Sequence, residues 1–166
     1  MSPVLRPWNI SDLEQLVSIA NNINIAKNLT NQFPHPYTEK DGIAFIERAT
    51  NFNPPQIFAI DLNGTAIGGI GIFPQSDILC KNAEIGYWLG EPYWGKGYIS
   101  KCIPEIVAYG FKTFDINRIF ARPFGHNIAS ARALEKAGFV KEGHFVKTIF
   151  KFGEYVDELF YAIRKS

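Results

Sequence analysis

The segment from Trp88 to Ser100 constrains the fold of this chain most strongly. An apolar stretch ends at Leu89, glycines follow at Gly95 and Gly97, and a helical pattern begins at Tyr98. The first amides of a helix have no partners within the helix, and the helix dipole adds partial positive charge at this end. Glycine lets the backbone approach a ligand without a Cβ clash. The segment therefore predicts a strand, a turn and a helix whose N-terminus binds a phosphate group.

The turn by itself does not separate a ligand site from a plain connection. A Gly-x-Gly sequence after a strand is equally typical of a tight turn. The segment lacks the Lys-Ser/Thr pair of a Walker loop and the further glycines of a dinucleotide fingerprint. The carboxylates that hold magnesium beside a nucleotide phosphate are also lacking, which argues against a nucleotide site.

Length and composition indicate one globular domain over residues 1–166. A chain of this length buries a core without disulfides or metal ions, and 46% hydrophobic with 20% charged residues is typical of folded proteins. The net charge of +1 argues against a general nucleic-acid binder. Cys80 and Cys102 have neither C-x-x-C spacing nor a nearby histidine cluster, so we expect no metal site and no disulfide.

The expected location is the cytoplasm. The chain has no apolar run of about 18 residues, so we expect no membrane span. Its first residues lack the apolar core of a signal peptide. Two free thiols suit a reducing compartment.

Periodicity and turn signals predict the remaining elements. Ser11 and Thr38 are expected helix N-caps, Asn63-Gly64 predicts a type I′ hairpin turn, and Asn127 and Gly138 should begin and end a helix. We expect strands at residues 4–6, 57–60, 66–73, 83–89, 118–121, 145–150 and 155–163, and helices at about 11–20, 38–49, 98–114 and 127–137. This order implies a mixed sheet with helices on both faces.

Several blocks, taken together and in order, resemble the GNAT superfamily of N-acetyltransferases, in its RimJ/RimL-like (ribosomal-protein N-terminal acetyltransferase-like) branch. The blocks are Phe33–Tyr37, Ala83–Leu89, Tyr93–Tyr98, Asn117–Ile119, and Asn127–Ser130 with Leu134–Phe139. The resemblance covers nearly the whole chain. It implies an α/β (α+β) fold with a mostly antiparallel central sheet of about seven strands. It also implies an acetyl-CoA-dependent enzyme without a metal ion.

The resemblance also implies where coenzyme A binds. The superfamily's phosphate loop reads Gln/Arg-x-x-Gly-x-Gly/Ala, and its positions fall on Trp94, Gly97 and Ile99. Trp94 and Ile99 depart from that pattern, but backbone amides do the binding. The residues implied on this segment are Trp94, Gly95, Lys96, Gly97, Tyr98, Ile99 and Ser100.

The end of the preceding strand matches the segment that pairs with the pantetheine arm in the family. Trp88, Leu89 and Gly90 occupy these positions. The resemblance implies that the Leu89 amide, or a neighbour, polarises the thioester carbonyl and holds the developing oxyanion. Removing one such donor typically costs about 3 kcal/mol of transition-state stabilisation.

Glu84 is the first candidate for the general base. It is an acidic residue in an otherwise apolar strand, on one face with Gly86 and Trp88 by the two-residue period. It precedes Gly97 by about the spacing at which several GNAT enzymes place a catalytic glutamate. The structural alternative is a carboxylate paired with an arginine or a backbone amide. The competing candidates are His35, His126 and His144.

Asn127 and Ser130 are the remaining candidates. Asn127 is expected to cap a helix, and in the resembling family the matching asparagine also bonds to the pantetheine arm. Many GNAT enzymes protonate the thiolate with a tyrosine at the position of Leu134, which this chain lacks. In the resembling branch a serine at the position of Ser130 stabilises the thiolate instead. The alternative is that Ser130 has only a structural role, because serine is favoured in the first turn of a helix.

The resemblance implies direct acetyl transfer to a primary amine, with no covalent enzyme intermediate. The acceptor is either a protein N-terminus or a small amine, such as an amino sugar, an antibiotic or a polyamine. A second enzymatic reading keeps coenzyme A but allows another acyl group or acceptor. A reading from a different class is a non-catalytic acyl-CoA-binding or interaction module on the same scaffold. The chain is expected to be a monomer or a homodimer.

Overall fold

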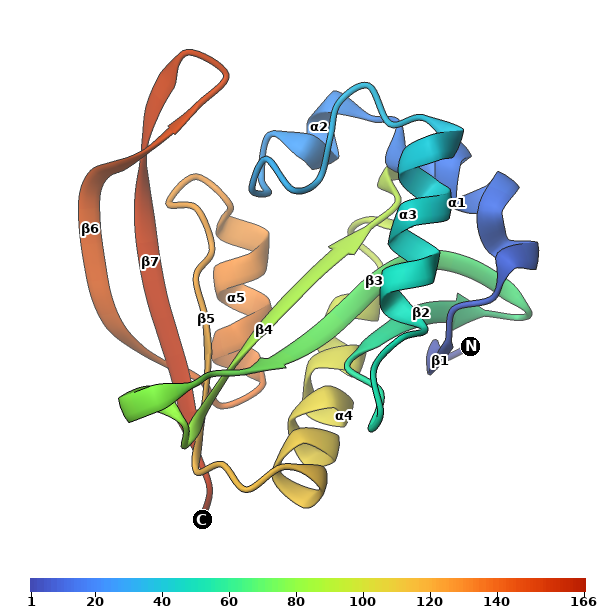
Figure 1. Cartoon of the computed structure of the whole chain (residues 1–166). Coiled ribbons are helices and arrows are strands. Elements are labelled where there is room, and N and C mark those ends of the chain that lie inside the picture. Colours follow the sequence, from blue (N-terminus) through green and yellow to red (C-terminus); the bar gives the residue numbers. More distant parts are fainter. The chain divides into compact units, whose positions relative to one another are not determined.

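The computed structural model describes residues 1–166 and contains a seven-stranded sheet with five α-helices (Figure 1). The strand order is β1-β2-β3-β4-β5-β7-β6. β4 and β5 pair in parallel, whereas β1–β2, β2–β3, β5–β7 and β6–β7 pair antiparallel. The strands are β1 (Val4–Pro7), β2 (Ile57–Leu62), β3 (Thr65–Pro74), β4 (Asn82–Leu89), β5 (Arg118–Ala121), β6 (Val140–Lys151) and β7 (Glu154–Arg164). The expected mixed, mostly antiparallel sheet is confirmed.

The chain forms two compact units. The first comprises Met1–Gly71 and Tyr87–Cys102, and the second comprises Ile72–Gly86 and Ile103–Ser166. The boundaries fall within β3, β4 and helix α4 (Tyr98–Thr113), so each of these elements contributes residues to both units.

In the first unit, helices α1 (Leu13–Ala20) and α3 (Glu39–Ala49) pack against each other. The contact is close at Gly42, where an added Cβ would lie 2.7 Å from Leu13 Cδ1. Thr38 caps α3 as expected, in a capping box with Asp41. The short helix α2 (Ile23–Ala26) was not expected from the sequence, because four residues are too few for a periodic pattern.

The N-cap expected at Ser11 is wrong. The cap is Asn9, whose side chain accepts from the Ser11 amide at 2.9 Å, and Asp12 completes the capping box. Asp12 is held in this position by Arg6, which donates to both of its carboxylate oxygens at 2.8 Å. Arg6 also donates to Asp61 on β2 at 2.7 Å. A 3-10 turn at Ile10–Asp12 therefore precedes α1, and its cap lies two residues before the expected one.

In the second unit, helix α5 (Ile128–Lys136) contacts both β6 and β7. The Tyr161 hydroxyl on β7 donates to Glu135 on this helix at 2.8 Å. Burial and this hydrogen bond raise the pKa of Tyr161 to about 12. Side chains of α4 and α5 complete a core with the strands of this unit. Its fully buried members include Ile72, Ile103, Ile106, Ile119 and Leu134.

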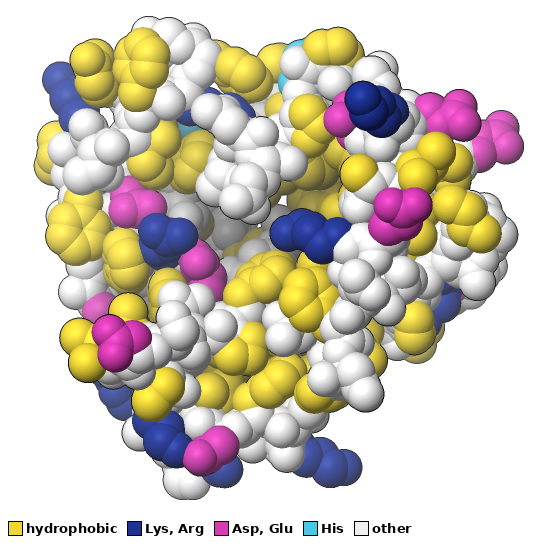
Figure 2. Space-filling view, in the orientation of Figure 1, with side chains coloured by type: hydrophobic (Ala, Val, Ile, Leu, Met, Phe, Trp, Pro, Cys, Tyr) yellow, Lys and Arg dark blue, Asp and Glu magenta, His cyan; other side chains and the backbone are white.

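The β6–β7 hairpin is longer than the sequence indicates. β6 begins at Val140, five residues before the expected start, and turns at Phe152-Gly153. A β-bulge interrupts the ladder between Phe145 and Ile149, with Lys147 at φ 54°. Exposed apolar side chains gather near its tip, at the upper left of Figure 2. The sequence indicates a shorter strand because the exposed, charged first half of β6 lacks the alternating apolar pattern of a half-buried strand.

Candidate functional site

The glycine turn of the first unit has the expected backbone geometry. Gly95 and Gly97 adopt φ values of 73° and 78°, in the left-handed region that glycine occupies at no steric cost. An added Cβ at either glycine would meet nothing within 4 Å, so these glycines are needed for the backbone conformation and not to relieve crowding. Helix α4 begins directly after the turn, at Tyr98. The predicted turn and helix start are thus confirmed, and phosphate binding at this helix N-terminus stays a prediction.

Trp94, which departs from the family pattern, makes a contact with the end of β4. Its indole Nε1 donates to the Leu89 carbonyl at 2.8 Å, so the side chain folds back onto the end of β4. The backbone of the turn stays unobstructed because this large side chain points away from it toward the strand. The departure from the usual Gln or Arg therefore leaves the amide cradle intact.

The end of β4 lies unusually close to β3. A Cβ at Gly68 would be 2.3 Å from the Trp88 carbonyl oxygen, so only glycine fits here. The Gly90 amide donates to the Ile67 carbonyl at 2.8 Å, and the Gly90 carbonyl accepts from Tyr93. Both backbone groups of Gly90 are thus used within the protein, and Gly90 shapes this segment without a free donor for a ligand.

The backbone amide of Leu89 points in the direction opposite to that of the Gly90 amide. Because successive residues of a strand alternate, the Leu89 amide points away from β3 when the Gly90 amide points toward it. The ladder between β4 and β5 joins only Asn82, Ala83 and Glu84 to their partners, and β4 continues beyond it to Leu89. The Leu89 amide therefore lies past the stretch of β4 that pairs with β5, and its role as an oxyanion donor stays a prediction.

An aromatic cluster lies beside the end of β4 in the first unit. The ring of Phe33 is 5.3 Å from that of Trp88 and 5.2 Å from that of Tyr37. Tyr37 is buried, and burial raises the pKa of its hydroxyl. The segment 33–37 is irregular, as its two prolines predict.

Glu91 ties α2 to the start of the glycine turn. Its Oε1 accepts from the side-chain amides of Asn22 and Asn24, at 2.9 and 3.0 Å. The hydrogen bonds from Asn24 and Asn22 lower the pKa of this carboxyl group. The contact was not predicted, because these residues are nearly seventy positions apart in the sequence.

Glu84 in the second unit is held by an arginine. Arg122 Nε is 2.7 Å from Glu84 Oε2 and Arg122 Nη2 is 3.1 Å from Glu84 Oε1. Arg122 Nη1 is also 3.8 Å from Glu158 on β7. The hydrogen bond to Glu84 raises the pKa of Arg122. Both carboxylate oxygens of Glu84 are occupied by the guanidinium, so this geometry favours the structural reading of Glu84.

Asn127 is the N-cap of α5, as predicted. Its Oδ1 accepts from the Ser130 amide at 3.3 Å, which leaves the Nδ2 group able to donate elsewhere. Ser130 is the third residue of the helix, so its hydroxyl belongs to the first turn. Asn127 and Ser130 are therefore brought together at one helix end, where partial positive charge favours an anionic partner such as a thiolate.

Residues 4–140 match the model of the acetyltransferase (GNAT) domain. The chain belongs to the GNAT family. The uncharacterized N-acetyltransferase YnaD of Bacillus subtilis (strain 168) is 29% identical over 160 residues, covering 96% of this chain and 92% of YnaD. The putative ribosomal N-acetyltransferase YdaF of the same organism is 28% identical over 113 residues, covering 63% and 62% of the two chains.

Solved structures agree with this assignment. The microcin C7 self-immunity acetyltransferase MccE, in complex with acetyl-CoA and AMP, is 26% identical with a TM-score of 0.83, covering 99% of this chain and 93% of that chain. The expected GNAT family is thus confirmed. The match to YdaF supports the RimJ/RimL-like branch within it.

Two residues of this GNAT chain that bind candidate catalytic side chains were not predicted from the sequence. Arg122 was not singled out, although it binds the leading candidate Glu84. Asp157 was not singled out either, although it lies 2.7 Å from the ring of His144. No sequence signal marks these partners, because the pairs are 38 and 13 residues apart and meet only through strand pairing.

Two features are not found in the structure, a metal-binding cluster and a membrane-spanning helix. No group of three or more His, Cys, Asp or Glu residues is placed to hold a metal ion. None of the helices combines the length and apolarity needed to span a bilayer.

Proposed function

We propose that this chain transfers the acetyl group of acetyl-CoA directly to a primary amine, without a covalent enzyme intermediate. The observation that carries the proposal is the left-handed turn at Gly95 and Gly97 before helix α4, in a chain of the GNAT family. Residues 1–166 would together serve this one activity.

The turn of the first unit would hold the pyrophosphate of coenzyme A. Unpartnered amides at the start of α4 point outward and require no charged side chain. The donors are the backbone amides of residues 95–100, with Trp94 holding the turn against Leu89. Acetyl-CoA supplies the activated acetyl thioester.

The Leu89 amide would stabilise negative charge on the thioester oxygen. Its direction away from β3 supports this role, as does the absence of a β5 partner for this part of β4. One donor of this kind contributes about 3 kcal/mol to the stability of a transition state.

In the second unit, the Asn127 Nδ2 group would donate to the pantetheine arm, and Ser130 would stabilise the leaving thiolate. Their shared place in the first turn of α5 supports both roles. Leu134, where many GNAT enzymes have a tyrosine, is fully buried and apolar, so it offers no proton.

The acceptor is a primary amine, either a protein N-terminus or a small molecule. The names of two relatives support these two kinds of acceptor: YdaF is a putative ribosomal N-acetyltransferase, and a Vibrio cholerae relative, 24% identical over 92% of this chain, is a spermidine N(1)-acetyltransferase. Cys80 is exposed, Cys102 is buried, and no disulfide joins them, which supports a reducing cytoplasm as the place of action.

Calorimetric titration with acetyl-CoA, free coenzyme A, ATP and NAD tests the cofactor. We expect binding of acetyl-CoA and coenzyme A and none of the other two. A panel of amines, including N-terminal peptides, polyamines and amino sugars, is then assayed for coenzyme A release. Binding without transfer to any amine would favour a non-catalytic acyl-CoA-binding module instead.

A further inference from the structure

His144 and Asp157 form a hydrogen-bonded pair on neighbouring strands of the second unit. His144 Nε2 on β6 is 2.7 Å from Asp157 Oδ2 on β7. The other carboxylate oxygen, Oδ1, accepts from the Lys147 amide at 2.9 Å. The hydrogen bond from His144, followed by that from Lys147, lowers the pKa of Asp157. The carboxylate therefore stays ionised and fixes one nitrogen of the imidazole, which leaves Nδ1 to accept a proton.

The backbone is shaped to make this pair. The ladder shifts register between Phe145 and Ile149, and Lys147 adopts φ 54°. A non-glycine residue in the left-handed region is uncommon, and β-bulges often re-aim side chains beside functional sites. Here the bulge turns the Lys147 amide onto Asp157. A merely exposed histidine would not require such a bulge.

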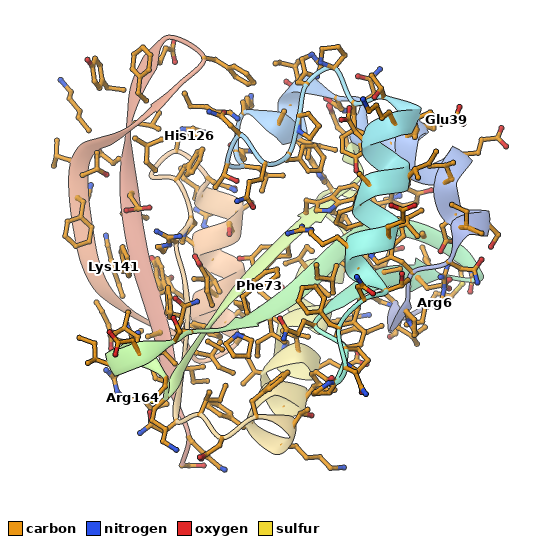
Figure 3. The ribbon with its side chains drawn as sticks, in the orientation of Figure 1. Arg6, Glu39, Phe73, His126, Lys141 and Arg164 are labelled. Atoms are coloured by element: carbon orange, nitrogen blue, oxygen red, sulfur yellow. The ribbon has the colours of Figure 1, made fainter.

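The pair adjoins the loop that leads to the candidate cofactor residues. The Gly125 amide donates to the Asp157 carbonyl at 2.7 Å, and an added Cβ at Gly125 would be 2.8 Å from Asp157 Cβ. Asn127 follows two residues later, so its Cα lies within about 7 Å of that of Gly125. Figure 3 shows His126, the residue between them, in this loop beside the β6–β7 hairpin. The pair thus lies next to the N-terminus of α5.

Both groups remain accessible. The side chains of His144 and Asp157 are 46% and 34% exposed, so an amine can reach the imidazole. Glu84, by contrast, has both oxygens bound by Arg122. Histidine changes its charge near neutral pH, which suits proton transfer from an amine.

We propose that His144, oriented by Asp157, is the proton acceptor for the attacking amine, which rests on the proposed acetyltransferase function. The ammonium form of the acceptor gives one proton to His144 Nδ1. The freed nitrogen lone pair forms the C–N bond to the acetyl carbon, and the C–S bond breaks with its electron pair leaving on sulfur. The second proton of the nitrogen neutralises the thiolate, and the imidazolium returns its proton to solvent.

Titratable and charged groups lie on each of the elements around His144, but only Asp157 contacts its ring. Asp157 faces it from β7 and His126 lies in the adjoining loop. On β6, Lys147 and Glu142 flank it, and Glu142 is itself bound by Arg118 and Arg164. Glu158 lies on the opposite face of β7, next to Arg122. Asp157 is therefore the group that most directly sets the orientation of the ring.

The test compares wild type with His144→Ala and Asp157→Asn, using an amine that the wild type accepts. We expect His144→Ala to lower kcat at least 100-fold, within the usual range for a general base. We also expect this variant to lose the fall in kcat that the wild type shows at low pH. The KM for acetyl-CoA should stay within twofold. Added imidazole should restore part of the rate to His144→Ala. Asp157→Asn should lower kcat by a smaller factor.

Glu154→Gln, on the same strand as Asp157 but exposed and away from the pair, is the matched control and should retain wild-type kcat. Folding of each variant is checked by circular dichroism. An unchanged kcat and pH profile in folded His144→Ala would overturn the dyad and leave the proposed function standing. A wild type that binds acetyl-CoA but acetylates no amine would overturn both.

Discussion

Arg122 donates two hydrogen bonds to Glu84, from Nε to Oε2 at 2.7 Å and from Nη2 to Oε1 at 3.1 Å. A planar guanidinium matches a carboxylate in this bidentate way, which gives geometric specificity as well as energy. The contact joins β4 to the residue that directly follows β5, and Arg122 also approaches Glu158 on β7. Arg122 thus links β4, β5 and β7 of the second unit, and Glu84 stabilises this contact between strands.

Glu84→Gln should therefore affect stability more than chemistry. The side chains of Arg122 and Glu84 are 41% and 23% exposed, so we expect a loss of about 1 kcal/mol in the free energy of unfolding. We expect kcat to fall only a few-fold, with an unchanged pH profile. Thermal unfolding and steady-state kinetics measure the two effects. A 100-fold loss of kcat at unchanged stability would restore Glu84 as the general base.

Gly97→Val should weaken acetyl-CoA binding. The φ of 78° is costly for any residue with a Cβ, by about 1–2 kcal/mol, and the valine side chain would project into the open space through which the pyrophosphate would approach the turn. Gly64→Val is the matched control, because Gly64 has φ 85° in the β2–β3 hairpin turn with open space around its Cβ position. Both variants should lose similar stability, but only Gly97→Val should lose affinity in calorimetry. Equal affinities would place the pyrophosphate elsewhere.

Gly68→Ala should disturb the end of β4. Its Cβ would lie 2.3 Å from the Trp88 carbonyl oxygen, a backbone atom that cannot move without shifting Leu89. We expect lower stability, by about 1–3 kcal/mol as is usual for overpacking, and a lower kcat. Gly86→Ala on the same β4 strand is the control, since its nearest neighbour would be at an ordinary 3.9 Å. Urea unfolding and kinetics distinguish the variants. Wild-type behaviour of Gly68→Ala would show that β4 tolerates displacement.

Acid should weaken the cluster around Arg6. Hydrogen bonds from Arg6 lower the pKa of Asp12 below its ordinary value near 3.8. A depressed folded-state pKa contributes stability above the unfolded pKa, and this stability is lost as the pH falls through the folded value. Asp12→Asn should therefore be less stable than wild type at pH 7, and the difference should shrink below about pH 4. Urea unfolding from about pH 2 to pH 7 measures it.

Asp115→Asn provides the comparison for this cluster. Asp115 also has an ion-pair partner, Lys81, but its side chain is 93% exposed. Solvent screens such a pair, so Asp115→Asn should leave the free energy of unfolding nearly unchanged across the same pH range. A pH-independent loss in Asp12→Asn would mean that its effect comes from the capping box and not from the charge.

Local signals in the sequence sufficed for the turns and helix ends. The Asn63-Gly64 hairpin, the Thr38 and Asn127 caps, and the stop at Gly138 all depend on residues within a few positions of one another. The glycine turn before α4 is of the same kind, because positive φ angles and free helix amides are properties of a short segment. These elements, with the GNAT motifs, were enough to predict the sheet and the glycine turn before α4.

The chemistry of the candidate site depended on tertiary structure. Asn9 replaces Ser11 as a cap because Arg6 holds Asp12, and Glu84 is engaged because Arg122 reaches it from the end of another strand. His144 meets Asp157 only through the register of a bulged hairpin. The sequence by itself determined the strand, turn and helix that can hold a phosphate. Only the fold decided which side chains are paired, since such pairs form between residues that are distant along the chain.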